Sequence, residues 1–181
     1  GVSNEFAAKA KEFQRPKSRK DKFINLGFHC RPYNRKRPEF LPEIMKYLPG
    51  FKLICCGEGH STLGIYNELI KNNRIEFKNY KFEDLNLFYE NIDLLVCCSV
   101  FEGGPTPLVE ANAFGIPFLS TDVGFAKEVA TNYDKIIEIN SNPIYMSECL
   151  IELCTNIGFK SKKIITWDKI VSDFYGQLKR S

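Results

Sequence analysis

The sequence predicts an α/β protein built on a doubly wound, mainly parallel sheet of the Rossmann-like kind. Its apolar runs are short and nearly continuous rather than alternating, which is typical of strands buried on both faces of a sheet. Segments of helical length and pattern separate these runs through the whole chain. The 181 residues suit one domain and suffice to bury a core.

The expected elements follow one another in a regular order. Strands are predicted at the runs KFINLGF (22–28), FKLICCG (51–57), RIEFK (74–78), IDLLVCC (92–98), IPFLS (116–120) and KIIEI (135–139). Helices are predicted at 38–48, 62–72, 82–92, 106–114 and 142–157, the first of them beginning at Pro38, a residue suited to a first helical turn. A last helix, 167–180, has no strand after it, so the domain proper is expected to span 1–166 and the closing helix 167–181.

The composition is that of an ordinary soluble globular protein, with 44% hydrophobic and 26% charged residues. No apolar run is long enough to span a bilayer, and no charged-then-apolar leader opens the chain, so a cytoplasmic location is expected. A net charge of +3 gives no reason to expect a nucleic-acid partner. The basic stretch 9–22 is interpreted as a solvated linker, with contact to an anionic membrane surface as the alternative.

The seven cysteines favour reduced thiols over a disulfide framework. Cys55 and Cys56, like Cys97 and Cys98, are adjacent pairs that end apolar runs, and neighbouring cysteines do not readily bridge to each other. A zinc site built from the two histidines and a cysteine pair lacks any supporting CxxC or HxxxH spacing. We therefore expect no metal site.

Ligands of open α/β sheets bind beyond the carboxyl ends of the strands, so the strand-to-helix turns are the segments to inspect. The first such turn, 27–39, carries Arg31, Arg35, Lys36 and Arg37. Cations at this place match a bound phosphate, although a solvated basic loop is the alternative. The second turn, 55–61, contains Gly57 and Gly59 in a GxG pattern that lacks the third glycine of the dinucleotide motif and is weak evidence alone.

In the third turn, FEGGPTPLVEANAFG (101–115), Glu102 and Glu110 stand on either side of two glycines and two prolines. Backbone N–H groups around Thr106, Leu108 and Val109 at the start of the following helix are expected to face an anion. Carboxylates accept hydrogen bonds from hydroxyls and repel phosphate, so the pair fits a ribose and a sugar that flank a diphosphate. The alternative is that both glutamates are helix-end and solvated charges.

The stretch EGGPTPLVEANAFGIPFLSTDVG resembles the E-x7-E signature of retaining GT-B glycosyltransferases of the family 4 type. GFHCRPYNRKRPE resembles the basic phosphate loop of that family, LICCGEG its next strand and turn, and FEDLNLFYENIDLLVCCS the helix and strand before the first glutamate. GVSNEF and the final W…FY helix resemble the entry and closing segments of the second domain. The family has an arginine directly after the glycine of its first strand, whereas here FHC stands between Gly27 and Arg31.

The resemblance implies that the chain is the C-terminal, nucleotide-sugar-binding half of a two-domain enzyme whose N-terminal acceptor-binding domain is missing. It implies that Arg31 and Lys36 bind the donor diphosphate, with Arg37 as the alternative to Lys36. Glu102 would hold hydroxyls of the transferred sugar and Glu110 those of the ribose. The expected donor-binding set is completed by Gly104, Pro105, Thr106, Pro107, Leu108, Gly57 and Gly59.

The implied reaction is transfer of a sugar from a nucleoside diphosphate sugar to an acceptor hydroxyl, with retention at the anomeric carbon and without a metal cofactor. Three other functions stay open. A glycosidase also uses paired carboxylates, but the basic loop disfavours hydrolysis. A nucleotide-sugar epimerase would bind the same donor, and a non-catalytic nucleotide-sugar-binding module would do no chemistry alone.

Overall fold

A computed structural model describes residues 1–15 and 23–178. Its centre is a six-stranded sheet with the order β3-β2-β1-β4-β5-β6, and every pairing in it is parallel. The strands are β1 (Ile24–His29), β2 (Phe51–Cys56), β3 (Ile75–Lys78), β4 (Leu94–Cys97), β5 (Phe118–Thr121) and β6 (Lys135–Ile137). All six predicted strands are thus confirmed, and with them the Rossmann-like fold class.

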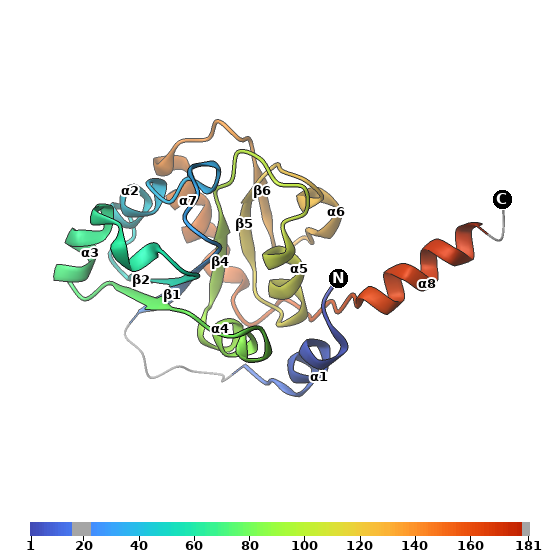
Figure 1. Cartoon of the computed structure of the whole chain (residues 1–181). Coiled ribbons are helices and arrows are strands. Elements are labelled where there is room, and N and C mark those ends of the chain that lie inside the picture. The colour runs from blue at the N-terminus through green and yellow to red at the C-terminus, as the bar shows by residue number, and fades with distance from the viewer. Residues whose placement is uncertain (16–22, 179–181) are drawn as a thin grey trace.

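Helices cover both faces of this sheet (Figure 1). One face packs against α2 (Phe40–Lys46), α3 (Asn67–Lys71) and α7 (Pro143–Leu153). The other packs against α1 (Asn4–Glu12), α4 (Asn86–Asn91), α5 (Thr106–Ala113) and α6 (Ala126–Val129). Short 3-10 turns lie at Asn34–Lys36, His60–Thr62, Gly64–Tyr66, Phe82–Asp84 and Cys154–Asn156.

Strand β1 lies at the middle of the sheet and is buried over most of its length. A Cβ added to Gly27 would come within 2.5 Å of Ile92 and 2.9 Å of Phe88, so glycine lets α4 and the chain after it approach the strand closely. Since β1 has β2 on one side and β4 on the other, the order of the strands reverses between β1 and β4. That reversal is the place where this fold class binds ligands.

The structure differs from the prediction in several segments, and α2 begins at Phe40 rather than at Pro38. Residues 9–12, interpreted as linker, belong to α1, because Ser3 caps this helix and Phe6 is buried with its ring 5.7 Å from Tyr89 and 5.3 Å from Phe114. Most of the rest of that stretch, residues 16–22, lies outside the described residues. The helix expected over 62–72 begins only at Asn67, since two 3-10 turns occupy the residues around Gly64.

The last helix, α8 (Trp167–Leu178), projects away from the sheet and its covering helices (Figure 1). Side chains near its start are exposed, among them Trp167, Ile170 and Val171. All seven cysteines are free thiols, as the sequence predicted. Within the described residues, no helix has the length and apolar character needed to cross a membrane.

Candidate functional site

The candidate site is the crevice at the carboxyl ends of β1 and β4, where the predicted basic loop meets the loop that carries Glu102. Three consecutive residues join the two loops. The Arg35 carbonyl accepts from the Val100 N–H at 2.8 Å, the Lys36 ammonium pairs with Glu102, and Arg37 Nε donates to the Cys98 carbonyl at 2.5 Å. The structure thus brings two segments 66 residues apart in sequence into direct contact.

Glu102 and Lys36 form the polar centre of this crevice. Their side chains are only 9% and 15% exposed, so the ion pair is partly shielded from water. Ser99 Oγ donates to the same Glu102 oxygen at 2.7 Å, which leaves the other oxygen of Glu102 without a hydrogen bond to any described residue. A hydroxyl donor entering the crevice could therefore be accepted by this carboxylate.

A small cavity of about 20 Å³ opens beside this pair. It is lined by Phe28, His29, Cys30, Lys36, Val96, Cys97, Ser99, Glu102, Pro105 and Pro107. These residues come from the ends of β1 and β4 and from the two loops that follow them. Burial raises the pKa of the Cys30 thiol, so this lining cysteine is protonated at neutral pH.

The other three cations of the basic loop point elsewhere. Arg31 is 62% exposed at the side chain and lies 3.5 Å from exposed Glu58. Arg35 stacks on the ring of Tyr33 with its guanidinium carbon 5.4 Å from the ring centroid. Arg37 is buried against the ring of Phe40, and its Nη2 has no hydrogen-bond partner among the described residues.

Glu110, the second predicted glutamate, lies on α5 with its side chain 14% exposed. The Tyr89 hydroxyl donates to Glu110 Oε2 at 2.5 Å, and His29 Nδ1 lies 2.8 Å from that hydroxyl and 3.4 Å from Glu110 Oε2. Glu110 Oε1 has no hydrogen bond to a described residue. His29 also lines the cavity beside Glu102, so it lies between the surroundings of the two glutamates.

The N–H groups expected to face an anion are mostly occupied. Thr106 N–H donates to the Gly104 carbonyl at 2.8 Å, and Leu108 N–H donates to the Pro105 carbonyl at 3.0 Å. The first bond closes an inverse γ-turn, because Pro105 has φ −72° and ψ 77°. The amides of Phe101, Glu102, Gly103 and Gly104, just before this helix, have no hydrogen-bond acceptor among the described residues; of these, Gly104 belongs to the expected donor-binding set.

The GxG turn after β2 has a structural explanation of its own. Gly57 has φ +135°, and a Cβ there would lie 2.3 Å from the Cys30 carbonyl oxygen. His60 Nε2 contacts the same carbonyl at 2.8 Å, and burial lowers the pKa of His60, so the neutral ring donates this bond. Gly57 and Gly59, with φ +94°, therefore let this turn lie against the basic loop whether or not they contact a ligand.

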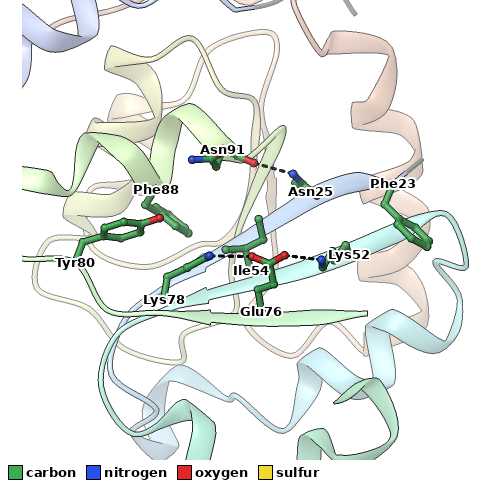
Figure 2. Close-up of a pocket in the computed structure, with 9 residues that line it drawn as sticks. All are labelled: Phe23, Asn25, Lys52, Ile54, Glu76, Lys78, Tyr80, Phe88 and Asn91. Carbon is green, nitrogen blue, oxygen red and sulfur yellow. Dashed lines mark hydrogen bonds and ion pairs between the residues drawn. The ribbon is translucent and has the colours of Figure 1, made fainter. Parts of the chain in front are cut away.

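A second hollow of about 240 Å³ lies on the sheet face beside α4 (Figure 2). Lys52 and Lys78 both pair with Glu76 at its floor, while Asn25 donates to the Asn91 carbonyl at its rim. Both lysines are thus paired with the same carboxylate, and the hollow lies along the strands rather than at their carboxyl ends. The geometry favours the crevice over this hollow as the site of chemistry.

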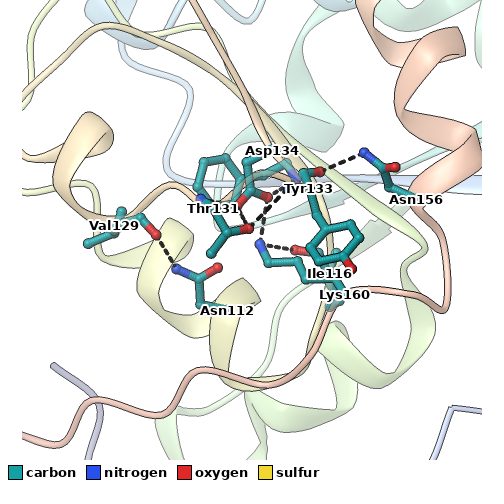
Figure 3. Close-up of polar contacts among 9 residues, drawn as sticks. Asn112, Ile116, Val129, Thr131, Tyr133, Asp134, Asn156 and Lys160 are labelled. Carbon is teal, nitrogen blue, oxygen red and sulfur yellow. Dashed lines mark hydrogen bonds and ion pairs between the residues drawn. The ribbon is translucent and has the colours of Figure 1, made fainter.

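A third polar cluster lies at the opposite edge of the sheet, at the amino ends of β5 and β6 (Figure 3). Lys160 Nζ lies 2.5 Å from Asp134 Oδ1 and donates to the Ile116 carbonyl at 3.0 Å, with both charged side chains fully buried. Asp134 also accepts from Phe118 N–H and from Thr131. This network fixes the segment after α7 to the sheet, far from the crevice. Among the described residues, no group of three or more His, Cys, Asp or Glu side chains could hold a metal ion.

Reasoning from the sequence missed three residues of the crevice. Ser99 stands two positions after β4 and could have been found from its place in a strand-to-helix turn. His29 is the last residue of β1, within the FHC insertion noted above. Tyr89 lies in a helix that ends before β4, and only the tertiary packing of α4 brings it to Glu110.

The family model of the glycosyl transferases group 1 matches residues 9–163 of the chain. Solved structures share the fold. Sucrose-phosphate synthase from Thermosynechococcus elongatus has a TM-score of 0.71 at 17% identity over 98% of this chain and 48% of its own. HepE of Anabaena in complex with UDP-glucose has a TM-score of 0.61 at 19% identity over 74% of this chain and 39% of its own.

The lipopolysaccharide outer core galactosyltransferase WaaB has a TM-score of 0.63 at 19% identity over 77% of this chain and 42% of its own. The chain thus spans less than half the length of these solved structures. It corresponds to one domain half of the GT-B fold, as the sequence predicted. No curated protein matches the sequence.

Proposed function

Because the chain belongs to the glycosyl transferases group 1, we propose that it is the donor-binding domain of a retaining enzyme that transfers a sugar from a nucleoside diphosphate sugar. The observation that carries this proposal is the contact between Lys36 and Glu102 at the strand reversal. It places a cation for phosphate and a carboxylate for sugar hydroxyls side by side. The structures of HepE with UDP-glucose and of TarM with UDP make UDP-sugars the first donors to test.

In this proposal the two glutamates mark the two ends of the donor, as the E-x7-E spacing suggests. Glu102 accepts hydrogen bonds from the transferred sugar through its free oxygen, and Glu110 accepts from the ribose through Oε1. The diphosphate lies between them, next to Lys36 and the free amides of Gly103 and Gly104. Arg31 can leave Glu58 for the diphosphate at little cost, since both side chains are mostly exposed and ion pairs of this kind contribute little to stability.

The proposed chemistry depends on charge that develops during bond cleavage. As the bond between the anomeric carbon and the diphosphate oxygen breaks, negative charge accumulates on the leaving diphosphate. Lys36 and the backbone amides are already fixed beside that position, and preorganised charge of this kind stabilises the transition state more than the ground state. These groups supply the positive charge without a metal ion, so the proposal assigns none a role.

In this proposal the acceptor binds outside the described residues. We propose that a second α/β domain, the acceptor-binding half, faces the carboxyl ends of β1 and β4. The projecting helix α8, with its exposed Trp167 and Ile170, would pack toward that domain. We expect the complete two-domain protein to transfer the sugar and this chain alone only to bind the donor.

A thermal-shift panel of UDP-, GDP- and ADP-sugars tests the donor-binding claim. A ligand at 100 times its Kd adds about 2.7 kcal/mol to the free energy of unfolding. For a chain of this size that raises Tm by roughly 5–10 °C. One nucleotide sugar is expected to produce this shift in the natural chain and in the control variant Lys46→Met. Lys46 is an exposed residue of α2 that pairs with Glu43.

Lys36→Met is expected to lose most of the shift, because it removes the cation nearest the diphosphate. If no nucleotide sugar stabilises the natural chain, the donor-binding assignment fails. If Lys36→Met and Lys46→Met respond alike, the ligand binds elsewhere. Product analysis with the complete two-domain protein separates transfer from epimerisation of the donor.

A further inference from the structure

Tyr89 connects His29 to Glu110 through a hydroxyl that is fully buried. Burial, together with the negative charge of Glu110, raises the pKa of Tyr89 well above its ordinary value, so the phenol keeps its proton. The ring is fixed on several sides. It stacks on Phe114 with centroids 5.8 Å apart and meets Phe6 and Phe88 edge-on.

Because the phenol of Tyr89 has a single proton to donate, its two hydrogen bonds determine which nitrogen of the His29 imidazole is protonated. Glu110 as a carboxylate can only accept, so the Tyr89 hydroxyl donates to it at 2.5 Å. The phenol oxygen must then accept at 2.8 Å from His29, and His29 Nδ1 carries a proton. Its other nitrogen, Nε2, has no hydrogen-bond partner in the described part of the chain and is the atom available to a ligand.

His29 lies where the diphosphate of the proposed donor would bind. It is the last residue of β1, beside the strand reversal, and it lines the cavity shared with Lys36, Ser99 and Glu102. Its side chain is 21% exposed, and its ring packs 5.4 Å from that of Phe88. The imidazole is therefore held in place but still reachable from the crevice.

The crevice has few cations for a ligand that carries more than one negative charge. Lys36 is the one cation of the basic loop that lines the cavity, and it is already paired with Glu102. Arg31 pairs with Glu58, while Arg35 and Arg37 stack on aromatic rings. A histidine that takes up a proton at Nε2 would supply a second fixed positive charge.

We propose that His29 binds the diphosphate of the donor as the imidazolium, and that Tyr89 is the positioning residue that presents its Nε2 to the phosphate. The proposal rests on the donor-binding function above. On binding, Nε2 takes one proton from the solvent, while the Nδ1 proton stays on its bond to Tyr89. The imidazolium then donates from Nε2 to a phosphate oxygen, and no covalent bond changes.

Charged groups of both signs surround the imidazole of His29. Glu110 and Glu102 are acidic and Lys36 is basic; the Tyr89 phenol bonds to the imidazole, and the thiols of Cys30 and Cys97 line the same cavity. The arriving phosphate adds negative charge next to Nε2, which favours uptake of a proton there.

Calorimetric titration with UDP, with GDP and ADP in parallel, tests this proposal. Heats measured at pH 7 in two buffers of different ionisation enthalpy give the number of protons taken up on binding. The natural chain is expected to take up a fraction of a proton and to bind more weakly as the pH rises from 6 to 8. His29→Asn is expected to abolish the uptake, to flatten the pH profile and to weaken binding by about ten- to hundredfold, as for loss of a hydrogen bond between charged groups.

Tyr89→Phe keeps the ring and its packing but leaves Nδ1 without its acceptor, and it is expected to reduce both affinity and proton uptake. The nucleoside uridine, which has no phosphate, should bind to the natural chain and to His29→Asn equally. Failure of the natural chain to bind any nucleotide overturns this proposal together with the donor-binding function. Binding of a nucleoside diphosphate without proton uptake, or with uptake unchanged in folded His29→Asn, overturns only the role of His29.

Discussion

At the level of single residues, the role of Glu110 depends on which of its oxygens is free. Oε2 accepts from Tyr89 and lies near His29, and Oε1 makes no contact with a described polar group. A carboxylate fixed in this way presents one acceptor in one direction. That suits recognition of a ribose hydroxyl better than a freely rotating surface glutamate would, because less side-chain entropy is lost on binding.

Glu110→Ala is predicted to weaken binding of a nucleoside diphosphate by about 1–3 kcal/mol, the range for a hydrogen bond to a charged group. The natural chain should also prefer UDP over 2′-deoxy-UDP, and the variant should bind the two about equally. Titration calorimetry well below Tm checks both statements. Glu128→Ala, at an exposed position on α6, serves as the control. A preference for the 2′-hydroxyl that persists in Glu110→Ala would mean that this carboxylate does not contact the ribose.

Some of the residues that line the crevice could be predicted from the sequence, and others could not. Lys36 and Glu102 stand in strand-to-helix turns, where local pattern and fold class together indicate a site. Arg37 has the same local context as Lys36, yet its positive φ of 51° directs it onto Phe40 and Cys98 instead. Neighbours in sequence thus point to different sides of the loop, and only the three-dimensional turn decides which one faces a ligand.

At the level of elements, the strands and most of the helices were predictable, whereas α1 and the four-residue α6 were not. The central strands are largely apolar runs whose burial on two faces is visible in composition, whereas the edge strands β3 and β6 are only partly buried. Helix α1 was missed because its stabilisation comes from Phe6 packing among aromatic rings of α4 and α5, contacts that are distant in sequence. Gly64, with its low helix propensity, stands where the helix predicted over 62–72 is replaced by 3-10 turns.

The segment after α7 is held by the buried pair of Lys160 and Asp134, and its stability should depend on pH. Burial lowers the pKa of Lys160 to about 8, although Asp134 beside it acts in the opposite direction. Between pH 8 and roughly 10.4, the ordinary lysine pKa, the unfolded chain binds more protons than the folded chain. The free energy of unfolding contributed by this group therefore rises with pH in that window.

We predict that the unfolding free energy of the natural chain, minus that of Lys160→Met, increases as the pH is raised from 8 to 10. Urea denaturation of both proteins at several pH values measures this difference. Lys71→Met, at an exposed position on α3, should follow the natural chain at every pH. A difference that is constant or falls over this range would show that Lys160 keeps its proton in the folded protein.

At the level of the whole molecule, the fold places its polar groups at two opposite edges of one sheet. The amino ends of β5 and β6 carry a network whose charges are fully buried and mutually satisfied. The carboxyl ends of β1 and β4 carry groups with unused capacity: an oxygen of Glu102, Oε1 of Glu110, Nε2 of His29 and the amides of Gly103 and Gly104. A structural role explains the first edge, and binding of a polar ligand explains the second.

The central claim is that the crevice between β1 and β4 binds a nucleoside diphosphate sugar. The most direct test is an amide NMR titration of the ¹⁵N-labelled chain with the nucleotide sugar that stabilises it most. The account predicts that the largest shifts fall on His29, Lys36, Ser99, Gly103 and Gly104. Largest shifts at Lys52, Glu76 and Lys78, in the hollow on the sheet face, or no saturable shifts at all, would contradict it.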